Sequence, residues 1–289
     1  MDIRFVTQND IDKVKWNSCV HYATNGNIFG YKWFLDFVAK DWDALVEGDY
    51  ESVFPLTWQK NFWGNKRLVQ PNLMRELGIF SIHVLSEKRV KAFLNAVPKE
   101  YKNINISLNE QNVLKTFPKG QLVPRINYQL WLNQPYEKIA GDYYPKQIEV
   151  YEKGKAAGFT LTTSLKPEKV ATFFQQYGEG PEKLKSISYH QLLRIMYNAL
   201  HRGWGSASGV YGPQNNLLAV NFFLYSHGKA VSLVPVESPE GEQLGALNFL
   251  FDLFIRSSAN RPMILDFNSS SAKWESFGAK RNHFHQYTR

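Results

Sequence analysis

The chain has 289 residues, of which 44% are hydrophobic and 21% are charged, so it can bury a core and is not a disordered protein. Its 34 Lys and Arg residues against 26 Asp and Glu residues give a formal net charge of +8, which favours anionic partners. The length fits one large domain or two ordinary ones, and we expect two. A single cysteine, Cys19, excludes an intrachain disulfide and a cysteine-cluster metal site, and it fits a reducing cytosol.

The beginning of the sequence carries no export signal. Residues 1–10 are mixed and polar, where a signal peptide would have an apolar stretch. No run approaches the roughly 18 apolar residues of a membrane span. We therefore expect a cytoplasmic protein with no membrane span.

The first half of the chain has the element order of an α/β unit around a mixed central sheet. Gly48-Asp49 supplies the positive φ angles of a tight hairpin turn. The segment 71–81, which contains Arg75, is expected to cross the open end of the sheet, where loops often carry function. The sequence predicts strands at 3–6, 42–58, 66–70, 104–108 and 127–132, and helices at 11–22, 28–39 and 87–97.

The second half repeats that order without visible sequence repetition, which predicts tandem domains of one fold. Asn133-Gln134-Pro135 is the expected boundary, so the domains are 1–133 and 134–289, with 134–158 as a basic connector. The predicted fold class is α/β (α+β), with a mixed central sheet flanked by helices in each domain. The elements expected after the connector are strands at 159–163 and 205–210, helices at 167–177 and 189–201, and a hairpin of 217–225 with 229–236.

Residues 229–267 are predicted to form a right-handed strand, loop, helix and strand unit. Pro, Ser and Gly residues mark 237–243 as a loop. From Leu244 the apolar residues follow a helical period, and 263–267 is a short apolar strand. The stripe of the helix consists of Leu247, Leu250, Phe251, Phe254 and Ile255.

A loop that leads into a helix N-terminus is a natural anion site, because unpaired N–H groups and the helix dipole both point at it. Gly241 and Gly245 would let a diphosphate approach, although Glu240 and Glu242 oppose an anion. Pro235 cannot complete a strand ladder, so we expect a bulge or a parting of strands there. Such a parting would form a slot.

The region 159–289 resembles a GNAT-superfamily acyltransferase domain, and it is similar to the Fem-type, tandem-GNAT branch. The resemblance lies in the segments Leu244–Leu250, Ile264–Ser270 and Trp274–Ala279, the last ending Phe-Gly-Ala. A fainter likeness at 28–35 and 53–56 extends it over nearly the whole chain. It implies two GNAT-like domains and transfer of an acyl or aminoacyl group to an amine, from a coenzyme A thioester or a charged tRNA.

The diphosphate loop of GNAT proteins resembles Gln/Arg-x-x-Gly-x-Gly/Ala. Counted from Glu242, this chain has Gly245 in place but Leu247 where Gly or Ala belongs. The resemblance implies acyl-CoA as the co-substrate. The residues expected to bind it are Val234, Val236, Gly241, Gln243, Leu244, Gly245 and Ala246.

Acylation of an amine needs a base to accept the proton of the nucleophile. Glu237, at the end of the slot strand, is the first candidate, and the alternative is an exposed loop carboxylate. Asp266 would be a base if desolvation raised its pKa, and the alternative is a cap for the turn at 269–271. Tyr211, Asn268 and Arg75 are the expected substrate-binding residues. The histidines lack a third ligand at useful spacing, so we expect no metal.

Three hypotheses follow, in order of preference. The first is an N-acyltransferase that moves an acyl group from acyl-CoA to an amine. The second is an aminoacyl-tRNA-dependent transferase that acts on a peptidoglycan precursor, which the basic segment 136–158 and the net charge favour. The third is a non-catalytic GNAT-fold binding module, which the degenerate loop favours. The expected partners are a small-molecule or peptidoglycan-precursor amine and, under the second hypothesis, tRNA, whereas no DNA is expected.

Overall fold

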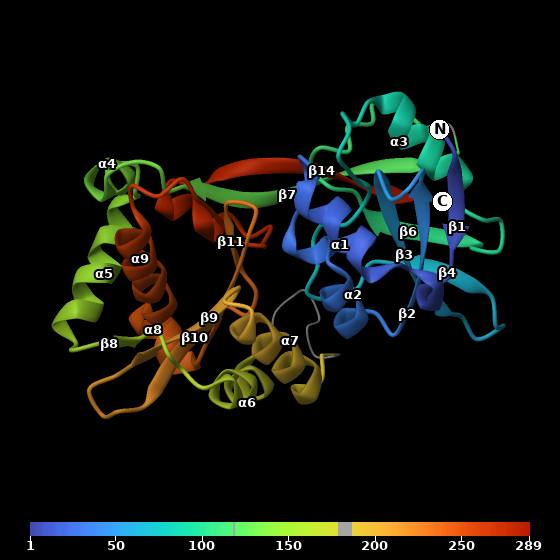
Figure 1. Cartoon of the computed structure of the whole chain (residues 1–289). Coiled ribbons are helices and arrows are strands. Elements are labelled where there is room, and N and C mark those ends of the chain that lie inside the picture. The colour runs from blue at the N-terminus through green and yellow to red at the C-terminus, as the bar shows by residue number, and fades with distance from the viewer. Residues whose placement is uncertain (118, 179–186) are drawn as a thin grey trace. The chain divides into compact units, whose positions relative to one another are not determined.

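The computed structural model describes residues 1–117, 119–178 and 187–289, and Figure 1 shows the course of the chain. It contains two compact units. Unit 1 consists of residues 1–126 together with 282–289, and unit 2 consists of residues 127–281. These units are defined by contacts within the chain. Whether domains 1–133 and 134–289 fold independently stays a prediction.

Unit 1 is a mixed sheet with helices at its faces. The neighbouring strands β1 to β4 are antiparallel, β4 and β6 are parallel, and β14 is antiparallel to β6. β5 pairs with β3. Its elements are β1 (Ile3–Val6), η1 (Gln8–Asp10), α1 (Lys13–Tyr22), η2 (Ile28–Gly30), α2 (Lys32–Val38), β2 (Asp41–Glu47), β3 (Ser52–Lys60), β4 (Lys66–Val69), β5 (Phe80–Ser81), α3 (Glu87–Ala96), β6 (Asn103–Ser107), the first part of β7 (Gln121–Trp131) and most of β14 (Lys280–Thr288).

The core of unit 1 forms where α3 packs on the sheet. Val90, Phe93 and Leu94 of α3 are fully buried, because they lie on one face of a helix that Ser86 caps through the N–H of Arg89. Phe54 of β3 meets Phe93 edge to face, with ring centroids 6.4 Å apart. Residues from β2, β4, β6 and β14 complete the cluster.

Unit 2 has the same succession of strand directions. β8, β9, β10 and β11 are antiparallel neighbours, β11 and β13 are parallel, and β7 is antiparallel to β13. Its elements are the end of β7, α4 (Tyr136–Ala140), α5 (Pro145–Ala156), β8 (Thr160–Thr162), α6 (Pro167–Tyr177), α7 (Tyr189–His201), β9 (Gly205–Tyr211), β10 (Leu217–Ser226), β11 (Lys229–Ser232), β12 (Val236–Glu237), α8 (Pro239–Leu244), α9 (Ala246–Ser258), β13 (Ile264–Asp266) and η4 (Ala272–Phe277).

Helix α9 anchors the core of unit 2. Its apolar stripe faces the sheet, and each fully buried Leu, Ile or Phe side chain contributes about 1.5–3 kcal/mol. Phe251 lies among four aromatic rings, with centroid distances of 5.9 Å to Phe223, 5.2 Å to Phe267, 4.7 Å to Trp274 and 6.3 Å to Phe277. On its other side α9 packs against α5, where Tyr151 stacks on Phe249 at 5.4 Å, and the two helices run side by side in Figure 1.

The predicted fold class is confirmed, because each unit is a mixed sheet flanked by helices. One local prediction was wrong. The expected loop at 237–243 contains helix α8, which starts where the Ser238 hydroxyl accepts a hydrogen bond from the N–H of Gly241 and Pro239 occupies the first helical position. The last helix, η4, is a 3₁₀ helix that ends at Gly278.

Candidate functional site

The parallel strands of unit 2 part after three residue pairs. The pairs join Lys229 to Ile264, Ala230 to Leu265 and Val231 to Asp266. β13 ends at Asp266, whereas the N–H groups of Leu233 and Val234 bond to β10. The strands therefore separate beside Pro235, as the sequence predicted.

A bulge accompanies this separation. The pairs Phe223–Ser232 and Val220–Val236 enclose two residues of β10 but three residues, 233–235, of the opposite strand. Asn221 stabilises the bulge, because its side-chain oxygen accepts the N–H of Val234 at 3.3 Å and the hydroxyl of Ser232 at 3.1 Å. Asn221 was not identified from the sequence as a residue of the site. It is the one polar residue in the apolar run 217–224, and that was the available signal.

The carboxylate of Glu237 lies at the N-terminus of α9. Its Oε2 accepts a hydrogen bond of 3.1 Å from the N–H of Leu247, one of the first unpaired N–H groups of that helix. Burial raises the pKa of Glu237, and the positive charge of Lys273 and the Leu247 bond oppose the rise. Glu237 is thus a partly buried helix cap rather than an exposed loop carboxylate.

The two glycines of the predicted anion loop have no free space beside them, because a side chain at either position would overlap neighbouring protein atoms. A Cβ on Gly241 would come within 2.3 Å of the carbonyl oxygen of Leu218, so this glycine lets α8 approach β10. A Cβ on Gly245 would come within 2.1 Å of Cγ1 of Val150. Gly245 has φ +73°, which ends α8 and allows α9 to begin at once. Both glycines therefore have packing and turn roles.

The remaining residues predicted to bind the donor surround the α8–α9 turn or precede it. Val234 and Val236 are buried in the bulged strand, and Ala246 is buried at the first position of α9. Gln243 and Leu244 are exposed on α8. Of these residues, Ala246 lies at the start of α9, and a role of any of them in binding a donor stays a prediction.

Asp266 is buried and its carboxylate makes three hydrogen bonds. Oδ1 accepts from Asn127 Nδ2 at 2.8 Å and from the N–H of Asn268 at 2.8 Å, and Oδ2 accepts from Gln129 Nε2 at 3.0 Å. The bond to Asn268 organises the turn after β13, where Asn268 has φ +50°. This geometry supports the capping alternative for Asp266, whose pairing also joins β13 to β7.

Two adjoining cavities lie along α6 in unit 2. One, of about 390 Å³, is lined by Tyr211, Lys169, Phe173 and Leu217 among others. The second, of about 750 Å³, lies between the start of α6, Tyr197 of α7 and β9, and it shares Glu168 and Lys169 with the first. Lys169 Nζ donates a 3.0 Å bond to the Tyr211 hydroxyl. Tyr211 therefore lines a cavity, which is not the parting at Pro235.

The first cavity is nevertheless close to Glu237 along β10. Its lining residue Leu217 is two residues before Ala219, which pairs with Glu237. Lys169 and Glu168 were not among the predicted site residues, because their α6 positions look like an ordinary solvated first turn. Only the folded chain places them against Tyr211.

Arg75 lies in unit 1, where its Nη2 donates a 3.1 Å hydrogen bond to the carbonyl oxygen of Ile126. This bond holds the segment before β5 in place. A substrate-binding role for Arg75 stays a prediction.

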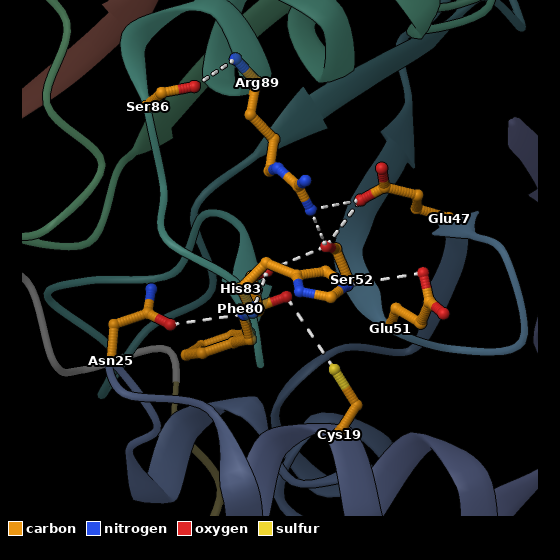
Figure 2. A network of polar contacts seen from close by, with 10 residues as sticks. Cys19, Asn25, Glu47, Glu51, Ser52, Phe80, His83, Ser86 and Arg89 are labelled. Carbon is orange, nitrogen blue, oxygen red and sulfur yellow. Dashed lines mark hydrogen bonds and ion pairs between the residues drawn. The ribbon is translucent and has the colours of Figure 1, made fainter. Parts of the chain in front are cut away.

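Unit 1 has its own buried polar network (Figure 2). Arg89 Nη1 donates to Glu47 Oε2 at 2.8 Å and to the Ser52 hydroxyl at 3.2 Å, and Ser52 lies 2.8 Å from the hydroxyl of Ser81. These bonds tie the β2–β3 hairpin to β5 and α3. Burial raises the pKa of the nearby Cys19 thiol to about 12, which disfavours the thiolate form.

Within 1–117, 119–178 and 187–289, no group of three or more His, Cys, Asp or Glu side chains could hold a metal ion. Over the same ranges, no helix combines the length and the apolar character that crossing a membrane requires.

Solved structures share this architecture over nearly the whole chain. FemX matches with a TM-score of 0.65 and 10% identity, covering 99% of this chain and 97% of its own. L-PGS from Bacillus licheniformis matches with a TM-score of 0.63 and 12% identity, over 96% and 92%. A tandem GNAT protein from the clavulanic acid biosynthesis pathway matches with a TM-score of 0.52 and 14% identity, over 99% and 98%.

No family model and no curated protein sequence matches the chain. At these identities the structural likeness shows the fold alone, which this chain shares with FemX, L-PGS and the tandem GNAT protein. The resemblance expected from the sequence is thereby confirmed at the level of fold.

Proposed function

We propose that the chain transfers an aminoacyl group from a charged tRNA to an amine, with a cell-wall precursor as the acceptor. The fold of Fem-type proteins supports aminoacyl or acyl transfer as the class of reaction. One observation carries the choice of donor: the carboxylate of Glu237 occupies the helix N-terminus at which an acyl-CoA diphosphate would bind.

The electrostatic reason is like-charge repulsion. Two unit charges 4 Å apart interact with about 4 kcal/mol in the surroundings of a protein surface. A diphosphate next to an ionised Glu237 would bear this cost, and it would also lose the N–H of Leu247 as a donor. A charged tRNA does not need a diphosphate site, so Glu237 does not oppose it.

The reaction forms a bond between the amine nitrogen and the acyl carbon and breaks the ester bond to the tRNA ribose. The nitrogen must lose a proton, and the ribose oxygen must gain one. Glu237 is our proposed base, because its burial raises its pKa towards the range in which a carboxylate accepts protons well. Asp266 already accepts three hydrogen bonds, and we assign it the positioning of β13.

The net charge of +8 supports a polyanionic donor. The predicted connector 134–158 adds nothing to this net charge, because its four Lys residues, three of them on α5, are balanced by four acidic residues. We place the reaction in the cytoplasm, where charged tRNA and soluble precursors are available.

Labelled aminoacyl-tRNA tests this donor in two ways: whether the protein retains the tRNA on a filter, and whether it transfers the aminoacyl group to an amine. We expect retention on a filter at low salt that falls steeply as the salt rises, because phosphate contacts release counterions. Transfer to amine-bearing precursors should be lost in Glu237→Gln and kept in the matched variant Glu242→Gln, which changes an exposed carboxylate of α8. Absence of retention at low salt would reject this donor.

Acyl-CoA is the second candidate donor, and the parting of β11 and β13 supports it. An extended thioester chain could enter where these parallel strands separate. Under this alternative, acetyl-CoA or a longer acyl-CoA would bind the wild type in isothermal titration, and Glu237→Gln would bind it more tightly. If neither donor binds, both transfer proposals fail and the binding-module hypothesis takes their place.

A further inference from the structure

The tip of the β3–β4 hairpin in unit 1 exposes two neighbouring aromatic rings. Phe62 is 95% exposed and Trp63 is 81% exposed. The rings meet edge to face, with centroids 5.5 Å apart. They extend past Lys60 and Lys66, the last paired residues of the two strands.

The backbone of this tip is well defined. The N–H of Asn61 bonds to the carbonyl oxygen of Asn65 at 2.9 Å, and the Asn61 side chain accepts the N–H groups of Trp63 and Asn65 at 3.0 and 2.9 Å. Gly64, with φ +77°, supplies the left-handed position of the turn. Asn61 and Gly64 therefore account for the turn, whereas Phe62 and Trp63 add no buried contact to the fold.

Positive charge follows directly behind the rings. The hairpin segment 59–67 contains Lys60, Lys66 and Arg67 and no acidic residue. Lys66 is bound to Glu100 at 3.0 Å, and Lys60 and Arg67 are exposed. The exposed Lys102 lies beside them, since its N–H bonds to the carbonyl oxygen of Lys66.

We propose that this hairpin tip docks on an anionic lipid surface. Aromatic side chains favour the boundary between hydrocarbon and headgroups, and Lys and Arg favour the phosphates just outside it. The hairpin has the same order, because the aromatic rings lie at its tip and the cations lie behind them. The contact is peripheral, because two rings and a few cations give reversible binding and not a membrane span.

Single-stranded RNA is the competing ligand for aromatic and basic residues. Bases stack on ring faces that are presented along a groove or a sheet surface. Here the two rings are nearly perpendicular, at 87°, and lie at the end of a hairpin, where one ring edge blocks the other face. This arrangement favours partition into a lipid interface.

The experiment is co-sedimentation of the whole chain with vesicles at low salt. We expect binding to vesicles of equal phosphatidylglycerol and phosphatidylcholine, and at least fivefold weaker binding to pure phosphatidylcholine. Phe62→Ser/Trp63→Ser should lower binding to the anionic vesicles to the phosphatidylcholine level. Lys60→Gln/Arg67→Gln should weaken it by about fivefold for each cation, from about 1 kcal/mol per basic residue.

The matched control is Val14→Ser/Tyr22→Ser, which removes two other exposed apolar side chains of unit 1, 77% and 71% exposed. It should bind like the wild type, and circular dichroism should show that all variants are folded. In the wild type, brominated lipids should quench Trp fluorescence, and Trp63→Phe should abolish most of that quenching. The proposal is overturned if wild type does not sediment, if Phe62→Ser/Trp63→Ser sediments equally, or if that variant loses only tRNA retention.

Discussion

The two units share one succession of strand directions, but their parallel strand pairs differ. In unit 1 the pairing of β4 with β6 continues past Val69, because the N–H of Gln70 bonds to Asn105 and its side-chain oxygen accepts the N–H of Ser107 at 3.0 Å. In unit 2 the equivalent pairing stops at Val231 and Asp266. The two units therefore share their strand topology, but only in unit 2 do the parallel strands separate directly after their three paired residues.

The difference comes from single residues. In unit 1, a parallel bridge between Leu77 and Leu108, beyond the ends of β4 and β6, also holds the two chain segments together. In unit 2, Pro235 lacks the N–H that such a closure would need, and the bulge turns the strand towards β10. A capped helix lies between the two strands of each parallel pair, α3 in unit 1 and α9 in unit 2. This difference supports our proposal that the site lies in unit 2, where the parallel strands separate.

The largest expected effect is at Asp266. Asp266→Ala should destabilise the protein by about 3–5 kcal/mol in urea unfolding, because two buried side-chain donors and one partly buried N–H would lose their acceptor. Glu242→Ala, which changes an exposed carboxylate, should stay within about 0.5 kcal/mol of the wild type. A small effect at Asp266 would show that β13 is held by its backbone pairing alone.

The next effect is at Gly245. Gly245→Ala should cost about 2–4 kcal/mol, because its Cβ would overlap Val150 and its φ is positive. In the double variant Gly245→Ala/Val150→Ala, the overlap is relieved, so the total should be at least about 1 kcal/mol less than the sum of the single costs. Simple additivity would mean that α5 does not press against the α8–α9 turn.

A smaller effect is expected in unit 1, where Gln70 closes the parallel pair. Gln70→Ala should destabilise by about 1–2 kcal/mol, since the N–H of Ser107 would lose its partner. Faster amide hydrogen exchange at Ser107 should accompany this loss. Gln59→Ala, an exposed position on β3, is the control. If exchange at Ser107 were unchanged, the proposed closure of unit 1 by Gln70 would be wrong.

The smallest expected effect is the pH dependence that Glu237 gives to the stability of the fold. Its pKa is higher in the folded protein than the ordinary 4.5, so its protonated form stabilises the fold at low pH, and that contribution is lost as the pH rises through the folded pKa. Glu237→Gln stays neutral. Its stability relative to the wild type should therefore increase from pH 4 to pH 7, measured by urea unfolding at each pH. A difference that falls over this range contradicts the raised pKa.

Periodicity was sufficient to predict the regular elements. The stripe from Leu247 to Ile255 predicted α9, and the apolar run at 263–267 predicted β13 within two residues. Helix α8 could also have been predicted, because Ser238-Pro239 is a helix start signal that the glycine of the same segment obscured. The fold class followed from the order of such elements.

The site was less predictable, because its contacts join residues distant in sequence. Nothing in the spacing of Glu237 and Leu247 indicates that a carboxylate caps α9, and nothing near Gly245 points to Val150 of α5. Likewise, Asp266 meets Asn127 across 139 residues. Local pattern identifies which residues are unusual, whereas only the folded chain shows their partners.

The C-terminal strand has a consequence for the order of folding during translation. Gln286, Tyr287 and Thr288 pair with β6, so residues that leave the ribosome after all of unit 2 complete the sheet of unit 1. The usual order, in which an N-terminal unit folds first, is thus reversed for the final step. During synthesis, β6 presents an unpaired edge that chaperones would have to protect until residues 282–289 emerge.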